Sequence, residues 1–263
     1  FIVKIVTGVI VATLAGLVLF GGTKRLASVT EKIVPVMAIL YLIGGLLVLC
    51  VNIVNVPAAI WSIFKFAFVP QALIGGGFGA AIVKAIQKGA QRGLFSNEAG
   101  MGSTPHAHAL ANVKNPHEQG TTAMIGVFID TFIVLTLNAL VVISTLYTKD
   151  GVLANGYVGG ITETINKTNL AQTAFGTVFG TDFGAMFVAI CLFFFAFSTV
   201  LSWNLFGKIN ATYLFGKKFA PVYTIIALVF IFMGTLLQND LVWELTDMFN
   251  YLMVLPNAIA LFA

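Results

Sequence analysis

Long apolar runs without charged residues recur along this chain, and they constrain its fold more than any other feature. No charged side chain lies between Lys4 and Lys24, and similar runs follow at intervals along the sequence. A helix needs roughly 20 apolar residues to cross the hydrocarbon core of a bilayer. Only 9% of the 263 residues are charged, against roughly 25% in an ordinary soluble domain. The chain has too few charges for a water-facing surface, which excludes a soluble enzyme, a coiled coil and a disordered protein.

The apolar runs predict an all-α, polytopic integral membrane protein, a helical bundle forming one transmembrane domain. They do not alternate between apolar and polar residues, as the strands of a membrane barrel do. Residues 58–73 are apolar but contain Lys65 and Pro70, so we expect an interfacial segment there. The polar residues 148–182 are expected to form an external loop, because lysine-rich loops elsewhere mark the cytoplasmic side. The expected spans are residues 5–22, 33–54, 78–112 (discontinuous), 121–147, 183–213, 220–237 and 242–263.

The segment of residues 93–105, GLFSNEAGMGSTP, places glycines, a carboxylate, an amide and hydroxyls between apolar flanks. Gly100 and Gly102 each disfavour a continuous helix by about 1 kcal/mol relative to alanine, and Pro105 removes a backbone donor. Non-helical backbone at membrane depth persists only where it lines a cavity or packs against protein. Broken helices of this kind form substrate sites in transporters. The segment therefore indicates either a broken helix at a substrate site or a loop rich in turn residues.

Ser198 and Thr199 place adjacent hydroxyls inside the expected span 183–213, and Trp203 lies one turn beyond Thr199 on the same face. Two hydroxyls together with backbone carbonyls form an oxygen environment that suits a small monovalent cation. The alternative is that both hydroxyls bond back to carbonyls of their own helix. The pair is therefore a candidate ion site.

Asp130 is the one acidic residue well inside a strong span. An ionisable side chain at membrane depth usually faces a cavity, an ion or a charged partner. A salt bridge to a basic residue such as Arg92 is the structural alternative. Asp130 is therefore a candidate ligand for a second ion.

His106 and His108 form a His-x-His pair, which together with Glu98 raises the alternative of an intramembrane metal-dependent enzyme. A zinc enzyme needs at least three convergent ligands, and the sequence offers no third ligand at a suitable spacing. Histidines in a loop are therefore favoured over a metal site. A channel is a further alternative, and it predicts transport that does not saturate.

Residues 93–105 closely resemble the signature of the alanine/glycine:cation symporters, also called sodium:alanine symporters. The resemblance extends from residues 16–35, GLVLFGGTKRLASVTEKIVP, to residues 245–262, LTDMFNYLMVLPNAIALF. It implies a fold of the leucine-transporter type, with two inverted five-helix repeats and discontinuous first and sixth helices. The chain is then expected to be partial, corresponding to about helices four to ten. The resemblance implies that N-terminal helices are missing, among them a broken first helix expected to carry half of both the substrate and sodium sites.

The resemblance also implies roles for individual residues at the substrate site. Glu98 either ties the broken helix ends together or senses the ammonium group of the substrate. Backbone groups between Asn97 and Gly102 meet the polar ends of the amino acid, and Trp203 favours a small side chain. The implied substrate-binding residues are Phe95, Ser96, Asn97, Glu98, Ala99, Gly100, Met101, Gly102 and Trp203.

For ions, the resemblance assigns Ser198 and Thr199 to a sodium site with the Phe195 carbonyl as a third oxygen, and Asp130 to a second ion. The function implied is sodium-coupled symport of alanine or glycine by alternating access in the cell membrane, which is transport and not enzymatic catalysis. Protons remain an alternative coupling ion. The expected partners are the small neutral amino acid, membrane lipid and the missing N-terminal helices, and neither a cofactor nor a nucleic acid is expected.

Overall fold

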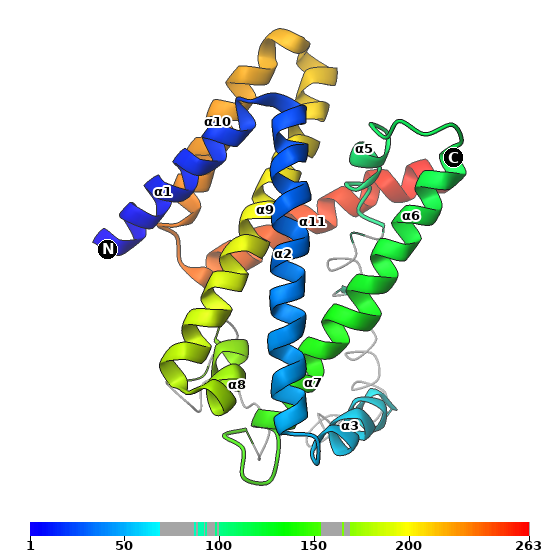
Figure 1. The fold of residues 1–263 in the computed structure, drawn as a ribbon. Coiled ribbons are helices and arrows are strands. Elements are labelled where there is room, and N and C mark those ends of the chain that lie inside the picture. Colours follow the sequence, from blue (N-terminus) through cyan, green and yellow to red (C-terminus); the bar gives the residue numbers. More distant parts are fainter. Residues whose placement is uncertain are drawn as a thin grey trace. The chain divides into compact units, whose positions relative to one another are not determined.

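The computed structural model describes residues 1–68, 87, 89–91, 93, 98, 100–153, 165 and 169–262. Within these ranges the regular secondary structure is entirely helical (Figure 1). Six helical stretches among the described residues are long and apolar enough to cross a membrane, which confirms the predicted all-α, polytopic class. These stretches are Ile2–Leu19, Gly22–Val51, Pro116–Leu146, Thr181–Phe215, Lys217–Gly234 and Asp240–Phe262.

Four of the spanning stretches lie within one regular element each, and the other two join consecutive elements. The stretch Pro116–Leu146 combines two α-helices with a π-helical segment between them. In chain order the elements are α1 (Ile2–Leu19), α2 (Gly22–Val51), α3 (Val56–Phe68), α5 (Pro105–His108), α6 (Pro116–Phe128), η2 (Ile129–Leu135), α7 (Thr136–Leu146), α8 (Leu170–Phe179), α9 (Thr181–Phe215), η3 (Lys217–Phe219), α10 (Ala220–Gly234) and α11 (Asn239–Phe262).

The first two helices meet at a tighter turn than the sequence predicts. The expected spans 5–22 and 33–54 leave residues 23–32 between them as a link, but α2 begins at Gly22 and includes these residues. Gly22 has φ +77°, a left-handed conformation that permits the reversal after α1. The residues that follow include lysine, arginine, leucine, alanine and glutamate, which are strong helix formers. The polar side chains therefore extend the helix beyond its apolar part.

Two other expected segments are partly described. The 13 residues of α3 (Val56–Phe68) are fewer than a bilayer crossing requires, and residues 69–73 of the expected interfacial segment lie outside the described residues. Most of the expected span 78–112 before residue 98 also lies outside them. Within the expected external loop 148–182, residues Leu170–Phe179 form α8.

The chain divides into two compact units, which are described separately. The first consists of Phe1–Pro35, Gly93–Gly120 and Phe194–Ala263, and the second of Val36–Arg92 and Thr121–Phe193. The candidate substrate segment, residues 93–105, belongs to the first unit, and so does the hydroxyl pair of α9, Ser198 and Thr199. Asp130 belongs to the second unit.

The core of the first unit forms where α1, the start of α2 and the second half of α9 pack together. Leu228 and Ile231 of α10 pack against it, and α1 and α10 lie side by side in Figure 1. A Cβ at Gly16 of α1 would lie 3.2 Å from Leu228 Cδ1, so the glycine allows the close approach of these two helices. The buried core residues are Ala15, Val18, Leu19, Leu26, Phe197 and Leu201.

In the second unit, α2 packs against both α7 and α9 through adjacent glycines. A Cβ at Gly45 would lie 2.6 Å from Leu137 Cδ2 of α7, and one at Gly44 would lie 2.5 Å from Phe187 Cζ of α9. The Tyr41 hydroxyl of α2 donates a 2.6 Å hydrogen bond to Asn138 Oδ1 of α7. Small residues and an interhelical hydrogen bond are the usual means of helix association where the surrounding lipid is as apolar as the side chains.

Candidate functional site

Of the expected substrate-binding residues in the segment 93–105, the structure describes Glu98, Gly100, Met101 and Gly102. The other expected residues of this segment, Phe95, Ser96, Asn97 and Ala99, lie outside the described residues.

Left-handed backbone defines the described part of this segment. Glu98 has φ +52°, Gly100 +91° and Gly102 +76°. Only glycine adopts this region at no steric cost, so the two glycines permit a path that most residues resist. Glu98, which has a Cβ, requires compensating contacts to hold it there. Glu98, Gly100 and Gly102 are therefore not α-helical, as the two glycines predict.

Two hydroxyls hold the Glu98 side chain. Ser103 Oγ donates to Glu98 Oε2 at 2.7 Å, and Thr104 Oγ1 donates to the same oxygen at 2.8 Å. The Glu98 carbonyl accepts a 3.3 Å bond from the Met101 N–H. Ser103 is only 1% exposed, so the first of these bonds is shielded from water. The Glu98 side chain is thus bonded to the residues that directly follow the left-handed turn, and its two expected roles stay predictions.

A residue that the sequence analysis did not select, Asn257 of α11, contacts the same segment. Its Nδ2 donates a 3.0 Å hydrogen bond to the Gly100 carbonyl. Asn257 follows a proline inside an apolar helix, and an amide in such a helix is the signal that identifies it in the sequence.

His106 connects the short helix α5 to the second half of α9. Its Nδ1 lies 2.9 Å from the Ser103 carbonyl oxygen, and its Nε2 lies 3.1 Å from Asn210 Oδ1. The ring centroids of His106 and Phe206 are 6.4 Å apart, and those of Phe206 and Trp203 are 6.2 Å apart. A series of contacts thus runs from Glu98 through Ser103 and His106 to Phe206, which lies next to Trp203 on α9. Two of the expected substrate-binding residues, Glu98 and Trp203, are therefore connected through these contacts.

The hydroxyl pair of α9 gathers three oxygens within one helical turn. Ser198 Oγ and Thr199 Oγ1 each donate a 2.9 Å hydrogen bond to the Phe195 carbonyl. Ser198 is buried, whereas Thr199 is exposed. These are the within-helix bonds of the alternative interpretation. These bonds also keep the three expected oxygens close together.

Asp130 lies in the first turn of the π-helix η2. Such segments are rare and often occur at functional sites, because the extra residue per turn redirects side chains. Asn138, which the sequence places eight residues further on, is bonded to Tyr41. The backbone at Asp130 is therefore π-helical and departs from the regular α-helix on either side of it.

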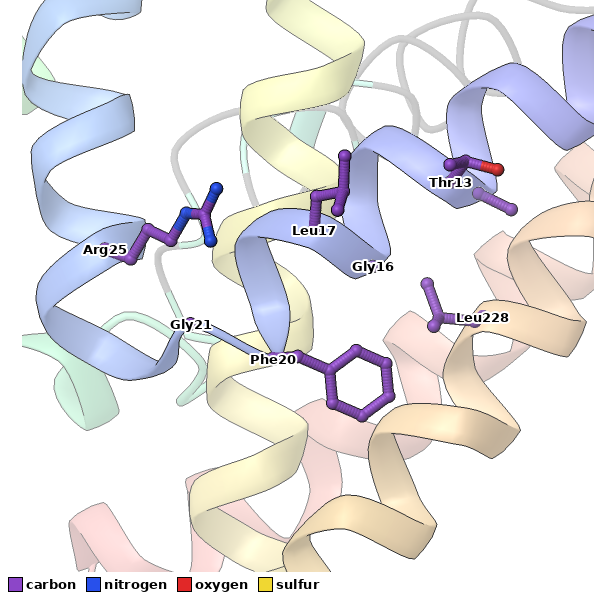
Figure 2. Close-up of a pocket in the computed structure, with 8 residues that line it drawn as sticks. Thr13, Gly16, Leu17, Phe20, Gly21, Arg25 and Leu228 are labelled. Atoms are coloured by element: carbon purple, nitrogen blue, oxygen red, sulfur yellow. The ribbon is translucent and has the colours of Figure 1, made fainter.

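A pocket in the first unit lies apart from these residues. It has a volume of about 600 Å³ and lies between α1, the start of α2 and α10 (Figure 2). None of the predicted substrate or ion residues lines it. Its lining is Ala12, Thr13, Gly16, Leu17, Phe20, Gly21, Arg25 and Leu228.

The described residues show no group of three metal-ligating side chains. His108 Nδ1 lies 2.8 Å from Gln119 Nε2 and His106 contacts two oxygens, so both histidines have protein partners. Two further buried amides have an atom without a hydrogen-bond partner among the described residues, Asn204 Oδ1 of α9 and Asn250 Nδ2 of α11. Sequence reasoning did not select either amide, although each interrupts an apolar helix.

The chain matches known proteins over nearly its whole length. Residues 2–263 match the model of the sodium:alanine symporter family. An uncharacterized transporter of Haemophilus influenzae is 41% identical over 98% of this chain and 54% of its own length. A sodium/alanine symporter of Methanococcus maripaludis is 37% identical over 98% and 53%, respectively. A sodium/proton-dependent alanine carrier protein of Bacillus sp. is 35% identical over 98% and 58%. The chain thus spans about half the length of the curated relatives it matches.

These matches agree with the membrane-spanning helices. The chain is an integral, multi-pass protein of the cell membrane, and its relatives are transporters, so it is not an enzyme. The metal-dependent enzyme considered from Glu98, His106 and His108 is therefore not favoured, and neither is a channel.

Proposed function

Because the chain belongs to the sodium:alanine symporter family, we propose that the protein couples the entry of sodium to the uptake of a small neutral amino acid, alanine or glycine. The observation that carries this proposal is the clustering of the Phe195 carbonyl with the Ser198 and Thr199 hydroxyls. Two relatives have names that include both sodium and alanine, which supports this choice of ion and substrate.

The three clustered oxygens supply half of a sodium site. A hydroxyl donates its proton to the Phe195 carbonyl and still offers lone pairs to a cation. Thr199 is exposed in this chain, so its oxygen is accessible to an ion and to ligands from another helix. We expect the remaining ligands to come from another helix. Asp130, in the π-helical segment η2, is proposed as a ligand of a second ion.

The substrate lies against the broken helix that contains Glu98, Gly100 and Gly102. We assign binding to the backbone and side chains of Phe95, Ser96, Asn97, Glu98, Ala99, Gly100, Met101 and Gly102, together with Trp203. Unwound backbone offers N–H and C=O groups to the carboxylate and ammonium of an amino acid. The bulky indole of Trp203 limits the space for the substrate side chain, which favours alanine and glycine.

The transport mechanism is alternating access in a fold of the leucine-transporter type with two inverted repeats. One group of helices rocks against the other, and the central site is exposed to each side of the membrane in turn. The membrane potential contributes roughly 2.3 kcal/mol per sodium charge per 100 mV. Sodium and amino acid order the same broken helices, so each raises the affinity for the other by the same factor.

The test measures alanine uptake by full-length protein in proteoliposomes as a function of sodium concentration. Ser198→Ala and Thr199→Val each remove one proposed ligand oxygen. Hydrogen bonds to a charged group contribute about 1.5–3 kcal/mol, so the half-saturating sodium concentration should rise about 10-fold or more in each variant. Ser202→Ala is the matched control, because Ser202 Oγ donates an equivalent 3.0 Å within-helix bond to the Ser198 carbonyl.

Equal sodium dependence in the wild type, both site variants and the control would refute the ion site. Uptake driven by a pH gradient without sodium would instead identify the proton as the coupling ion. Competition by glycine and by larger neutral amino acids, compared between wild type and Trp203→Ala, tests the assignment of Trp203. If this residue limits substrate size, the variant accepts larger side chains.

A further inference from the structure

The left-handed turn at Glu98, Gly100 and Gly102 depends on contacts from outside the turn. Backbone with these φ angles cannot form the repeating bonds of a helix. Each peptide group then needs another partner, because an unpaired one at membrane depth is costly. The position of those partners decides which peptide groups remain available to a ligand.

One peptide group of this turn is held at both ends. The Met101 N–H donates to the Glu98 carbonyl at 3.3 Å, and the Gly100 carbonyl accepts from Asn257 Nδ2 at 3.0 Å. The Gly100–Met101 peptide plane therefore has a defined orientation.

Asn257 also contacts the second glycine. A Cβ at Gly102 would lie 2.7 Å from Asn257 Oδ1 and 2.9 Å from its Cγ. Real Cβ atoms do not approach other atoms this closely, so Gly102 packs directly against the amide. One side chain thus bonds to Gly100 and occupies the space beside Gly102.

This use of an asparagine differs from that of two others among the described residues. Asn52 Nδ2, just after α2, donates to the Val48 carbonyl at 2.9 Å, and Asn210 Nδ2 of α9 donates to the Phe206 carbonyl at 3.0 Å, in both cases four residues back along the chain. Asn257 instead bonds to a residue 157 positions away in sequence. Pro256, directly before it, has no N–H and favours a bend in α11. The Asn257 amide therefore does not simply bond to a nearby backbone carbonyl of its own segment, as the other two asparagines do.

We propose that Asn257 is a positioning residue for amino-acid binding, holding the Gly100–Gly102 turn in the orientation that presents its neighbouring backbone groups to the substrate. This inference rests on the proposed function for the identity of the substrate, but the contact itself does not. Asn257 acts through the turn and is not assigned a contact with the amino acid.

The experiment compares Asn257→Leu with Asn52→Leu in the full-length protein. Leucine has nearly the shape of asparagine and cannot donate a hydrogen bond. Both variants lose a bond from a side-chain amide to a carbonyl, of 3.0 and 2.9 Å respectively, but only the first loses the contact with the turn. Two measurements are made, alanine uptake kinetics and amide hydrogen exchange of peptides covering residues 98–104.

Asn257→Leu should raise the KM for alanine about 10-fold, with a smaller change in maximal rate, and speed exchange in residues 98–104. Asn52→Leu should change neither. Asn257→Gln keeps an amide donor, so its KM should lie between those of the wild type and the leucine variant. If Asn257→Leu does not fold, Asn257→Ala gives the same comparison without any possibility of crowding the turn.

Unchanged exchange in residues 98–104 of the leucine and alanine variants would overturn the contact. Faster exchange with an unchanged KM would overturn the positioning role and leave a purely structural bond. A wild-type protein that takes up no alanine refutes the proposed function instead, and the exchange measurement still reports whether Asn257 holds the turn.

Discussion

Replacing Glu98 with glutamine separates its two expected roles, tying the turn together and sensing the substrate ammonium. Glu98 Oε2 accepts hydrogen bonds from Ser103 Oγ at 2.7 Å and Thr104 Oγ1 at 2.8 Å. Glutamine keeps the size and shape of the side chain but removes its charge. Both hydroxyl bonds then change from charge-assisted to neutral.

The expected effect follows from the two bond energies. A hydrogen bond to a charged group contributes about 1.5–3 kcal/mol and a neutral one about 0.5–1.5 kcal/mol. Glu98 is half-buried and its charge is partly screened. We therefore expect Glu98→Gln to weaken the two bonds by about 1–2 kcal/mol together. If the substrate binds only when both hydrogen bonds of the turn are formed, this loss of bond energy raises the KM for alanine by at most about 5- to 30-fold.

The assay is sodium-driven alanine uptake by the full-length protein in proteoliposomes, with a second variant that attacks the same bonds from the donor side. Ser103→Ala combined with Thr104→Val removes both hydroxyls and leaves the carboxylate in place. If Glu98 ties the turn, both this pair and Glu98→Gln raise the KM for alanine. Thr246→Val in α11 is the control, because Thr246 bonds within its helix to Val242 at 2.7 Å.

A KM that rises in Glu98→Gln but remains at the wild-type value in the Ser103/Thr104 pair would refute the reasoning. That result would assign the carboxylate to the substrate ammonium. An unchanged KM in both variants would remove Glu98 from the site altogether.

Two further predictions concern packing in the second unit and are measured by thermal unfolding of the full-length protein in detergent. Gly184→Ala should destabilise it by about 1–3 kcal/mol, because a Cβ there would lie 2.6 Å from the backbone nitrogen of Gly176. Gly126→Ala, with nothing within 4 Å of the new Cβ, should be neutral or stabilising, and equal losses in both would contradict the packing. Tyr41→Phe removes the 2.6 Å bond to Asn138 and should cost about 0.6–2 kcal/mol. A melting temperature equal to that of the wild type would show that the hydrogen bond contributes nothing.

Local patterns in the sequence predicted the helices and the position of the break. The apolar runs predicted a polytopic helical membrane protein, and six helical stretches of the described residues are long and apolar enough to cross a membrane. This class is predictable because the cost of burying polar groups in lipid depends mainly on the residue types within one segment. Gly100 and Gly102 predicted the non-helical turn, and both have left-handed φ values. The boundary between α1 and α2 was harder to predict from the sequence, because Gly22 permits a turn so tight that the polar residues after it remain helical.

Local sequence patterns did not predict which distant residues hydrogen-bond to the turn and to the residues that follow it. Nothing near Gly100 in sequence indicates that its carbonyl bonds to Asn257, and nothing near His106 indicates the contact with Asn210. Each bond joins residues more than 100 positions apart. The sequence alone thus determined a polytopic membrane protein with a non-helical turn at Gly100 and Gly102, since hydropathy and glycine conformation are properties of short segments. Only the tertiary structure decided which side chains hold that turn, because helix packing brings distant amides within hydrogen-bonding distance of it.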